Sequence, residues 1–567
     1  MLVKVGVAFS YYFFLGTKEL KNKGGQETMK KLLVGIMVLV MLIPAMVLAS
    51  PTPEELMKRI DQLNQELQQV KSELGNVQTQ QNQTKQTVEQ VSKKVGTTGG
   101  LPKSRFAFTG GDFRFRVDST RAHVPAYYDE MGYMKALGAW QQGGMQGPMP
   151  TINNYLQKAY SPKNDDLYTT RLRLNMLAKA TENIVFKGRL AMYKIWGMET
   201  ANATAAPFFA NNGFVWDPNI SRRPNDNTVR VEMAYVNWAN IGGYPIWLSV
   251  GRRPTVDGPP EQLRLNLLHR YATPVALGVD WTFDGISGGY AYFDPFPGKI
   301  RFCYGRGYQT GFQGIPGQQK IDNVDLYGLS WDVIDDPDRD MFANIQLFKA
   351  GDVPDIMENT NIWGMPNEPS NNLGDIYHLS GVFMHKLFGI DYFVSGGLSH
   401  TDPRGVSRQF IGLIDPADPS QGQGGYGLLN NPGENQQHWG WAAYTGFRVP
   451  VEQLNSKVGL EYNYGSRYWI NFTPASDDLY LSKLATRGHV AELYWIWDLP
   501  ETPVSKFGRA FIRAGYQYYW INYTGSGSWV GKPMDVDSLR DPSNASYMGE
   551  PAVSRMDNAY MTFEVYF

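Results

Sequence analysis

The sequence predicts an all-β fold, a transmembrane antiparallel up-and-down β-barrel of about sixteen strands, preceded by an α-helical coiled coil. Three observations indicate this fold. From residue 105 onward, apolar and polar residues alternate with a period of two, as in strands that turn one face to lipid. Long and short connections alternate between these strands. The last strand alternates strictly and finishes on the aromatic Phe567.

The composition agrees with this fold class. Aromatic residues make up 13% of the 567 residues and charged residues only 19%, with 59 glycines. Aromatic and glycine richness without long apolar runs is typical of barrel strands that face lipid. The net charge of −1 argues against a nucleic-acid partner. The single cysteine, Cys303, excludes disulfide frameworks and cysteine-based zinc or haem sites, so no cofactor is expected.

The first part of the chain predicts export. Residues 29–49 read as a signal peptide, because two lysines precede an apolar stretch and a small-residue cleavage site at Ala49. An uncleaved membrane anchor is the alternative, although the apolar stretch is short for a span. Lys23-Gly24-Gly25 is what a translated ribosome-binding site would encode. Residues 1–28 are therefore interpreted as a mis-called start.

Residues 50–97 predict a coiled-coil stalk. Their apolar positions step by four and three, which is a heptad seam. The seam consists of Leu56, Ile60, Leu63, Leu67, Val70, Leu74, Val77, Gln81, Thr84, Val88, Val91 and Val95. A disordered spacer is the alternative. Glycine-rich residues 98–104 are expected to be a flexible linker to the barrel, residues 105–567.

Sixteen segments of the barrel region are expected to be strands. They are 106–117, 167–180, 183–196, 228–238, 245–252, 283–293, 299–308, 323–334, 341–350, 376–386, 390–400, 438–449, 457–465, 487–498, 507–520 and 554–567. Short connections are expected on the periplasmic side and long ones outside, so the first strand rises from the periplasm and the sixteenth returns to it. This even number of strands places both the coiled coil and the C-terminus on the periplasmic side. The ranges 245–252 and 283–293 are the weakest, so fourteen or eighteen strands also stay open.

The last strand carries a specific signal. Phe563, Val565 and Phe567 alternate with polar residues, and this pattern resembles the C-terminal signature by which the barrel-assembly machinery recognises outer-membrane proteins. A secreted β-sandwich or propeller is the structural alternative, but it would not require long and short loops to alternate.

Sorting each strand by parity gives an apolar outer set and a charged inner set. The pore-lining candidates are Arg114, Arg116, Arg171, Arg173, Lys187, Arg189, Arg230, Glu232, Arg509 and Arg513. A basic wall in a water-filled lumen would concentrate anions, which predicts a mild anion preference. The alternative is that the inward arginines brace the barrel by pairing with Asp112, Glu232, Glu461, Glu492 and Glu564.

The combination of signal peptide, coiled coil, sixteen or so strands and terminal Phe567 resembles a Gram-negative outer-membrane porin with a periplasmic stalk, a layout similar to that of the phosphate-selective porins. The segment from Gly251 to Pro260 resembles more closely an uncharacterised porin-like family of anaerobic bacteria. This resemblance implies an outer-membrane channel for passive diffusion of small hydrophilic solutes.

Porins of this kind also imply homotrimers and a loop folded into the pore. Loop 253–282 and the longest loop, 118–166, are candidates for it. The constriction residues suggested at the first of them are Arg252, Arg253, Asp257, Glu261 and Arg264. The phosphate-selective members imply an arginine ladder, which the scattered inward arginines match only loosely.

The sequence does not predict an enzyme. Seven histidines show no metal-ligand spacing, and no nucleotide-binding or nucleophile-elbow motif is present. Two other functions stay open at this stage. The stalk could tether the outer membrane to peptidoglycan or a surface layer, or the barrel could sheathe a cytochrome in an electron conduit.

Overall fold

The computed structural model describes residues 106–567 except 198–223, 225–226, 268–269, 271, 312–320, 356–370, 406–413, 416–417, 423–426, 432, 474–477, 501–507 and 542–551. The chain divides into two units, Met1–Lys103 and Ser104–Phe567. The predicted mis-called start, signal peptide, coiled-coil stalk and linker all lie outside the described residues. They stay predictions.

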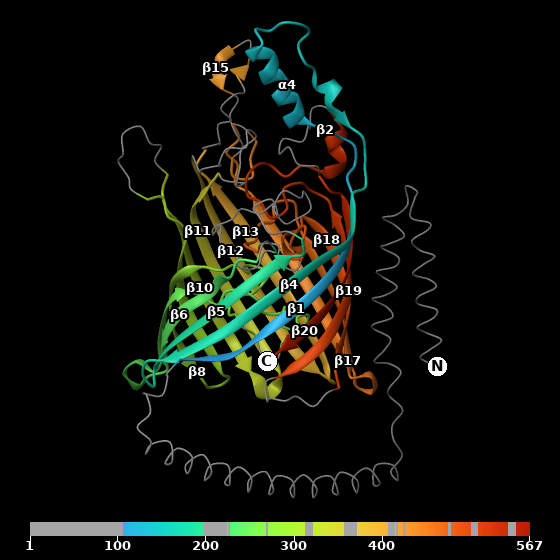
Figure 1. Ribbon diagram of the computed structural model, residues 1–567. Helices are drawn as coiled ribbons and strands as arrows, with labels where there is room; N and C mark the ends of the chain where they lie inside the picture. Colours follow the sequence, from blue (N-terminus) through green and yellow to red (C-terminus); the bar gives the residue numbers. More distant parts are fainter. Residues whose placement is uncertain are drawn as a thin grey trace, which may run out of the picture. The chain divides into compact units, whose positions relative to one another are not determined.

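Sixteen antiparallel strands close into a barrel in which each strand pairs with its neighbours in chain order (Figure 1). The strands are β1 (Phe106–His123), β4 (Lys163–Lys179), β5 (Ile184–Ile195), β6 (Arg230–Trp238), β7 (Ile246–Arg252), β8 (Asp284–Tyr292), β9 (Gly298–Tyr308), β10 (Val324–Asp336), β11 (Met341–Pro354), β12 (Asn372–Leu387), β13 (Ile390–Pro403), β16 (Trp439–Val451), β17 (Ser456–Gly465), β18 (Gly488–Asp498), β19 (Arg509–Ile521) and β20 (Arg555–Tyr566). The predicted barrel is confirmed, and each predicted range overlaps one strand.

The barrel closes between its first and last strands. β1 pairs with β20 in a continuous register from Asp112 opposite Tyr566 to His123 opposite Arg555. Just before this ladder, the backbones of Gly111 and Phe567 exchange two hydrogen bonds of 2.7 and 3.1 Å. Since no open strand edge is left at this seam, the backbone is satisfied all the way round.

Short turns join the strands at one end and long connections at the other. The short turns include the 3₁₀ segments η4 (Ile241–Gly243), η5 (Pro337–Arg339) and η6 (Glu452–Leu454). The long connections carry β2 (Tyr127–Tyr128), α4 (Glu130–Gln142), η2 (Ile152–Tyr155), β3 (Leu156–Gln157), β14 (Ile414–Asp415), β15 (Asp418–Gly422) and η8 (Val536–Arg540). Figure 1 shows α4 and β15 at the end of the barrel opposite the C-terminus.

α4 begins where Asp129 accepts a hydrogen bond from the backbone N–H of Gly132 at 2.8 Å, a side-chain N-cap. Within the described residues, no helix is both long and apolar enough to cross a membrane. In the chain, α4 lies between β2 and β3, in the connection from β1 to β4. The predicted loop 118–166 is one of the two candidate constriction loops. Its first residues, up to His123, belong to β1, and the rest includes β2, α4, η2 and β3.

The outer face of the barrel is apolar. On β10, Tyr327, Leu329 and Trp331 are 45%, 50% and 43% exposed, and Ile345 and Leu347 stand beside them on β11. Comparable exposed apolar residues recur on strands all around the barrel. Monomeric soluble proteins rarely expose so large an apolar surface, and a belt of this kind is the lipid-facing surface of a transmembrane barrel.

Aromatic rings gather near both rims of this belt. Toward the long connections, the ring of Tyr464 lies 4.8 Å from both Trp441 and His489. Toward the short turns, Phe383 and Tyr392 lie 6.4 Å apart. Such girdles mark the two lipid–water boundaries of membrane barrels.

The predicted assembly signal lies at the end of β20. Phe563 and Phe567 are 40% and 48% exposed, and Val565 is half-buried between them in sequence. The parity that was predicted for this strand is therefore correct. Its recognition by the assembly machinery remains a prediction.

A charge placed on the lipid-facing surface tests the belt. We expect Leu347→Arg, near the middle of β11, to lower the free energy of unfolding by about 2–4 kcal/mol, because the guanidinium would sit in hydrocarbon. The matched variant Leu454→Arg, in a short turn where Leu454 is 63% exposed, should cost about 0–1 kcal/mol. Reversible denaturant unfolding in lipid vesicles measures both. Equal costs for the two variants would contradict the assignment of the belt.

Candidate functional site in the barrel lumen

The lumen holds most of the charged residues that parity assigned to the inner face. Seven of the ten pore-lining candidates are at most 6% exposed: Arg114, Arg116, Arg171, Arg173, Arg189, Glu232 and Arg513. Their side chains are covered by other protein atoms rather than by open water. The contacts that cover them decide what the lumen can do.

Two arginines of β4 share carboxylates from two different segments. Arg171 Nη2 lies 3.0 Å from Asp112 Oδ1, and Arg173 Nε lies 2.7 Å from Asp112 Oδ2. Arg173 Nη1 also lies 2.8 Å from Asp257 Oδ2, which comes from the connection between β7 and β8. Burial of these guanidinium groups is tolerated because each has a charged partner.

Three more predicted cations are paired within the wall. The pairs are Arg189 with Glu232 at 3.1 Å, Arg513 with Glu564 at 3.0 Å and Arg116 with Asp118 at 2.6 Å. Arg114 donates from Nη2 to the hydroxyl of Tyr193 at 2.9 Å. These contacts are of the kind that the bracing interpretation requires.

The remaining pore-lining candidates are less covered. Lys187 is exposed, and half-buried Arg230 donates to the backbone carbonyl of Thr228 at 3.2 Å. The guanidinium carbon of Arg509 lies 4.6 Å from the ring centroid of Tyr566.

The connection between β7 and β8, residues 253–283, enters the barrel and is called the first inward loop below. Its Arg264 is 2% exposed and lies 3.2 Å from Glu261 and 3.7 Å from Glu492 of β18. The carboxylate of Asp257 in this loop binds Arg173 of β4. The backbone N–H of Asp257 donates a hydrogen bond to the carboxylate of Asp280, in the same loop, at 2.8 Å. The loop therefore binds charged groups of two well-separated parts of the wall.

Backbone and amide contacts extend the reach of this loop across the lumen. The carbonyl of Leu263 accepts from Arg448 of β16 at 2.9 Å, and that of Arg264 accepts from Arg513 of β19 at 3.0 Å. The side chain of Asn266 donates to Asp498 of β18 at 2.8 Å. A loop that starts at β7 is thus fixed on the opposite wall.

A second inward loop, residues 466–487 between β17 and β18, contains η7 (Lys483–Ala485). The ammonium of Lys483 is bound by Glu461 and, at 2.6 Å, by Glu492, which lie opposite each other on β17 and β18. Asp478 accepts from the backbone N–H of Lys483 at 2.9 Å and from Gln517 of β19 at 2.7 Å.

Lys483 and Arg264 both belong to loops rather than to membrane-spanning strands. Burial and the nearby Arg264 would lower the pKa of Lys483, but Glu461 and Glu492 outweigh them and leave it above its usual value. Burial would also lower the pKa of Arg264, yet the carboxylates around it, Glu492 first, raise it well above normal. Both groups are therefore charged at neutral pH.

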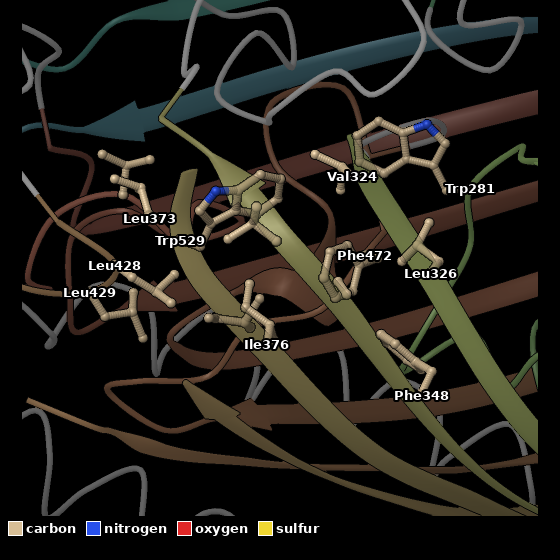
Figure 2. Packing of buried hydrophobic residues seen from close by; sticks show 14 of the residues in the cluster. Trp281, Val324, Leu326, Phe348, Leu373, Ile376, Leu428, Leu429, Phe472 and Trp529 are labelled. Atoms are coloured by element: carbon tan, nitrogen blue, oxygen red, sulfur yellow. The ribbon is translucent and has the colours of Figure 1, made fainter. Parts of the chain in front are cut away.

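Apolar side chains of the two loops pack against the wall. Leu263, Val275, Ala276 and Leu277 of the first loop form one cluster with Trp469 and Leu484 of the second and with wall residues that include Phe342, Val382 and Tyr444. Figure 2 shows a second cluster, in which Phe472 and Trp529 lie beside Phe348 and Ile376 of the wall. The hydrophobic core of this barrel lies inside its lumen.

Arg252 ends β7, and Arg253 begins the first inward loop. Arg252 Nη1 lies 3.3 Å from Asp284 Oδ2 on the neighbouring strand. Arg253 binds the hydroxyl of Ser249, and its guanidinium carbon lies 5.0 Å from the ring centroid of Tyr235.

One cavity of about 200 Å³ opens at the end of the barrel that carries the short turns. Arg270, Asp335, His385 and Tyr392 are among the residues that line it. Arg270 contacts Asp335 at 2.8 Å there. In the described part of the chain, no three His, Cys, Asp or Glu side chains are arranged to hold a metal ion.

The arrangement is a lumen crossed by loops, in which many buried arginines and Lys483 are paired with carboxylates. The sequence indicated the wall arginines and the loops 253–282 and 118–166 as candidates, but not Lys483, Asp478 or Trp469. The sequence does contain a signal for the second inward loop: it carries three leucines, Leu479, Leu481 and Leu484, which are unusual in a connection exposed to solvent. An apolar long loop in a barrel indicates that the loop packs inside.

A family profile described as "Protein of unknown function (DUF3373)" matches residues 161–567. A search among curated proteins found no match.

Among solved structures, the chain is similar to OmpT, an outer membrane protein of Vibrio cholerae, with 9% identity and a TM-score of 0.35 over 83% of this chain and 100% of that one. Pseudomonas putida OprB is 10% identical with a TM-score of 0.38 over 82% and 94%. The anion-selective porin from Comamonas acidovorans is 9% identical with a TM-score of 0.38 over 82% and 100%. What this barrel does has to be inferred from its own residues.

The lysine that holds two carboxylates gives a test of the lumen network. We expect Lys483→Met to cost about 3–5 kcal/mol, because it leaves Glu461 and Glu492 buried without their cation. The control Lys163→Met removes an exposed pair with Asp165 and should leave the free energy of unfolding nearly unchanged. Denaturant unfolding followed by tryptophan fluorescence measures both. Adding Glu461→Gln to Lys483→Met should recover part of the loss, and equal costs for the two lysine variants would refute the network.

Proposed function

The chain belongs to the family described as a protein of unknown function (DUF3373), and we propose that this member is an outer-membrane porin-like channel for passive diffusion of small hydrophilic solutes. One observation carries the proposal: a closed barrel with an apolar belt outside holds a lumen lined by charged and polar side chains. A barrel that only anchored the chain would not need buried charge, which is costly to place inside a membrane.

The proposed channel is narrow. Two inward loops share one apolar cluster with the wall, in which Trp469 of the second loop is completely buried. Its indole N–H donates to the carbonyl of Leu484 at 2.9 Å, which ties the two ends of the second loop together. Solutes that pass this region have to be small, or the loops have to move.

Weak charge selectivity follows from the ion pairs. A basic wall would attract anions only if its arginines kept their field, and Asp112, Glu232 and Glu564 neutralise several of them. Any anion preference of the proposed channel then depends on cations without a carboxylate partner. No catalytic step is proposed for this lumen.

Two other functions differ in what the lumen would contain. A sheath around a cytochrome would have to displace both inward loops and their ion pairs, which speaks against it. A tether to peptidoglycan or a surface layer, through the predicted stalk of residues 50–97, is compatible with a filled lumen and is the second candidate. Homotrimer formation through that stalk remains a proposal.

Conductance of the purified full-length protein in planar bilayers tests the channel. We expect small single-channel steps and a cation-to-anion permeability ratio near one in a salt gradient. Absence of conductance from folded protein would refute the channel and favour the tether.

A pair of tryptophan variants tests the role of the loops. Trp469→Ala removes the side chain that packs the second inward loop, so single-channel conductance should rise. Trp441→Ala, on the outer face where Trp441 is 49% exposed, should leave it unchanged. A core Trp→Ala change costs about 3–5 kcal/mol, so heat-modifiable mobility on gels should first confirm that both variants fold. Equal conductance of folded Trp469→Ala and wild type would contradict the proposed constriction.

A further inference from the structure

Arg253 differs from Arg252 beside it and from Arg301 on β9, both of which pair with a carboxylate. Among the described residues, Arg253 itself forms no ion pair. Its contacts are the Ser249 hydroxyl and the face of the Tyr235 ring. A half-buried guanidinium that has only a hydroxyl and a ring as partners lacks the counter-charge that offsets desolvation.

The side chains next to Arg253 are short and polar. Ser249, Ser287 and Cys303 occupy one register row across β7, β8 and β9. Arg253 reaches this row from the loop by its bond to Ser249. These neighbours are short, and Arg253 itself is half-buried rather than fully covered.

A second guanidinium stands on the same inner face. Arg301 lies two residues before Cys303 on β9 and is 4% exposed. Its Nη2 binds Asp332 at 2.5 Å, while its buried Nη1 has no hydrogen-bond acceptor. Arg301 lies on the inner face one step along β9 from the row that Arg253 reaches through Ser249, and the like charges of the two guanidinium groups repel each other. An anion between them would relieve this repulsion and supply the missing acceptor.

We propose that Arg253 and Arg301, with the hydroxyls of Ser249 and Ser287, form a binding site for a small oxyanion, either a carboxylate or an inorganic anion. The planar guanidinium fork matches two oxygens of such a group, and the serine hydroxyls supply further donors. This anion site depends on the proposed channel in one respect only, which is that the anion would reach the site through the channel. It places any anion preference at this site rather than along the arginine wall.

Equilibrium binding to the full-length protein in detergent tests the site without any need for conduction. Isothermal titration calorimetry is done once with sulfate, an inorganic oxyanion, and once with acetate, a carboxylate. We expect at least one of the two anions to bind saturably. We expect Arg253→Gln to weaken this binding at least tenfold and Arg253→Lys to weaken it less, because lysine keeps the charge but not the fork. Binding of sulfate alone or of acetate alone supports the site and identifies the source of the oxyanion.

The matched control is Arg306→Gln. Arg306 lies on the same strand as Arg301, pairs with Asp325 at 2.8 Å and belongs to the outward parity of β9. The Arg306→Gln variant should bind the anion as tightly as the wild-type protein does. Circular dichroism and heat-modifiable mobility on gels should confirm that every variant is folded. The site is refuted if wild type binds neither anion, if Arg253→Gln binds as well as wild type, or if Arg306→Gln loses as much.

The two proposals can fail separately. A barrel that conducts but binds neither anion refutes this site and leaves the channel standing. A folded barrel that binds sulfate or acetate through Arg253 but does not conduct refutes the channel and leaves the site.

Discussion

The structure depends on one constraint, which is that backbone polar groups in hydrocarbon must find partners within the protein. A sheet satisfies it only by closing, and here the closure joins β1 to β20, more than 400 residues apart in sequence. Once closed, the sheet has an inside and an outside, and each strand must alternate between them. The outer belt of Leu329, Leu347 and their neighbours and the inner charges of Arg173 and Glu492 are two consequences of this closure.

The inner charges in turn determine where the loops lie. Arg173 is bonded to Asp112 on the adjacent strand and to Asp257 on the first inward loop, so the wall and the loop share one cation. Lys483 does the reverse, since a loop residue neutralises Glu461 and Glu492 on the wall. A buried charge that loses its partner costs several kcal/mol, so displacing either loop carries an electrostatic penalty in addition to the lost apolar packing.

The sequence predicted the barrel well because strand parity is a local property. Arg171 and Arg173 had to face inward once Leu172 and Leu174 faced lipid, whatever the rest of the chain did. Which carboxylate each arginine meets is not local, since it depends on register, and β1 and β4 shift register at bulges near Phe108 and Asp118. For the same reason Lys483 could not be placed, because a loop has no period that indicates which way it folds.

Neutralisation of the wall changes what an arginine count can mean for selectivity. An arginine that a carboxylate neutralises contributes little to the field in the lumen, and the ion preference of the proposed channel then depends on the groups whose charge is not compensated. Arg253 is such a group, whereas Arg173, with two carboxylates, is not. For the proposed channel, ion pairing is therefore a better guide to selectivity than the composition of the inner face.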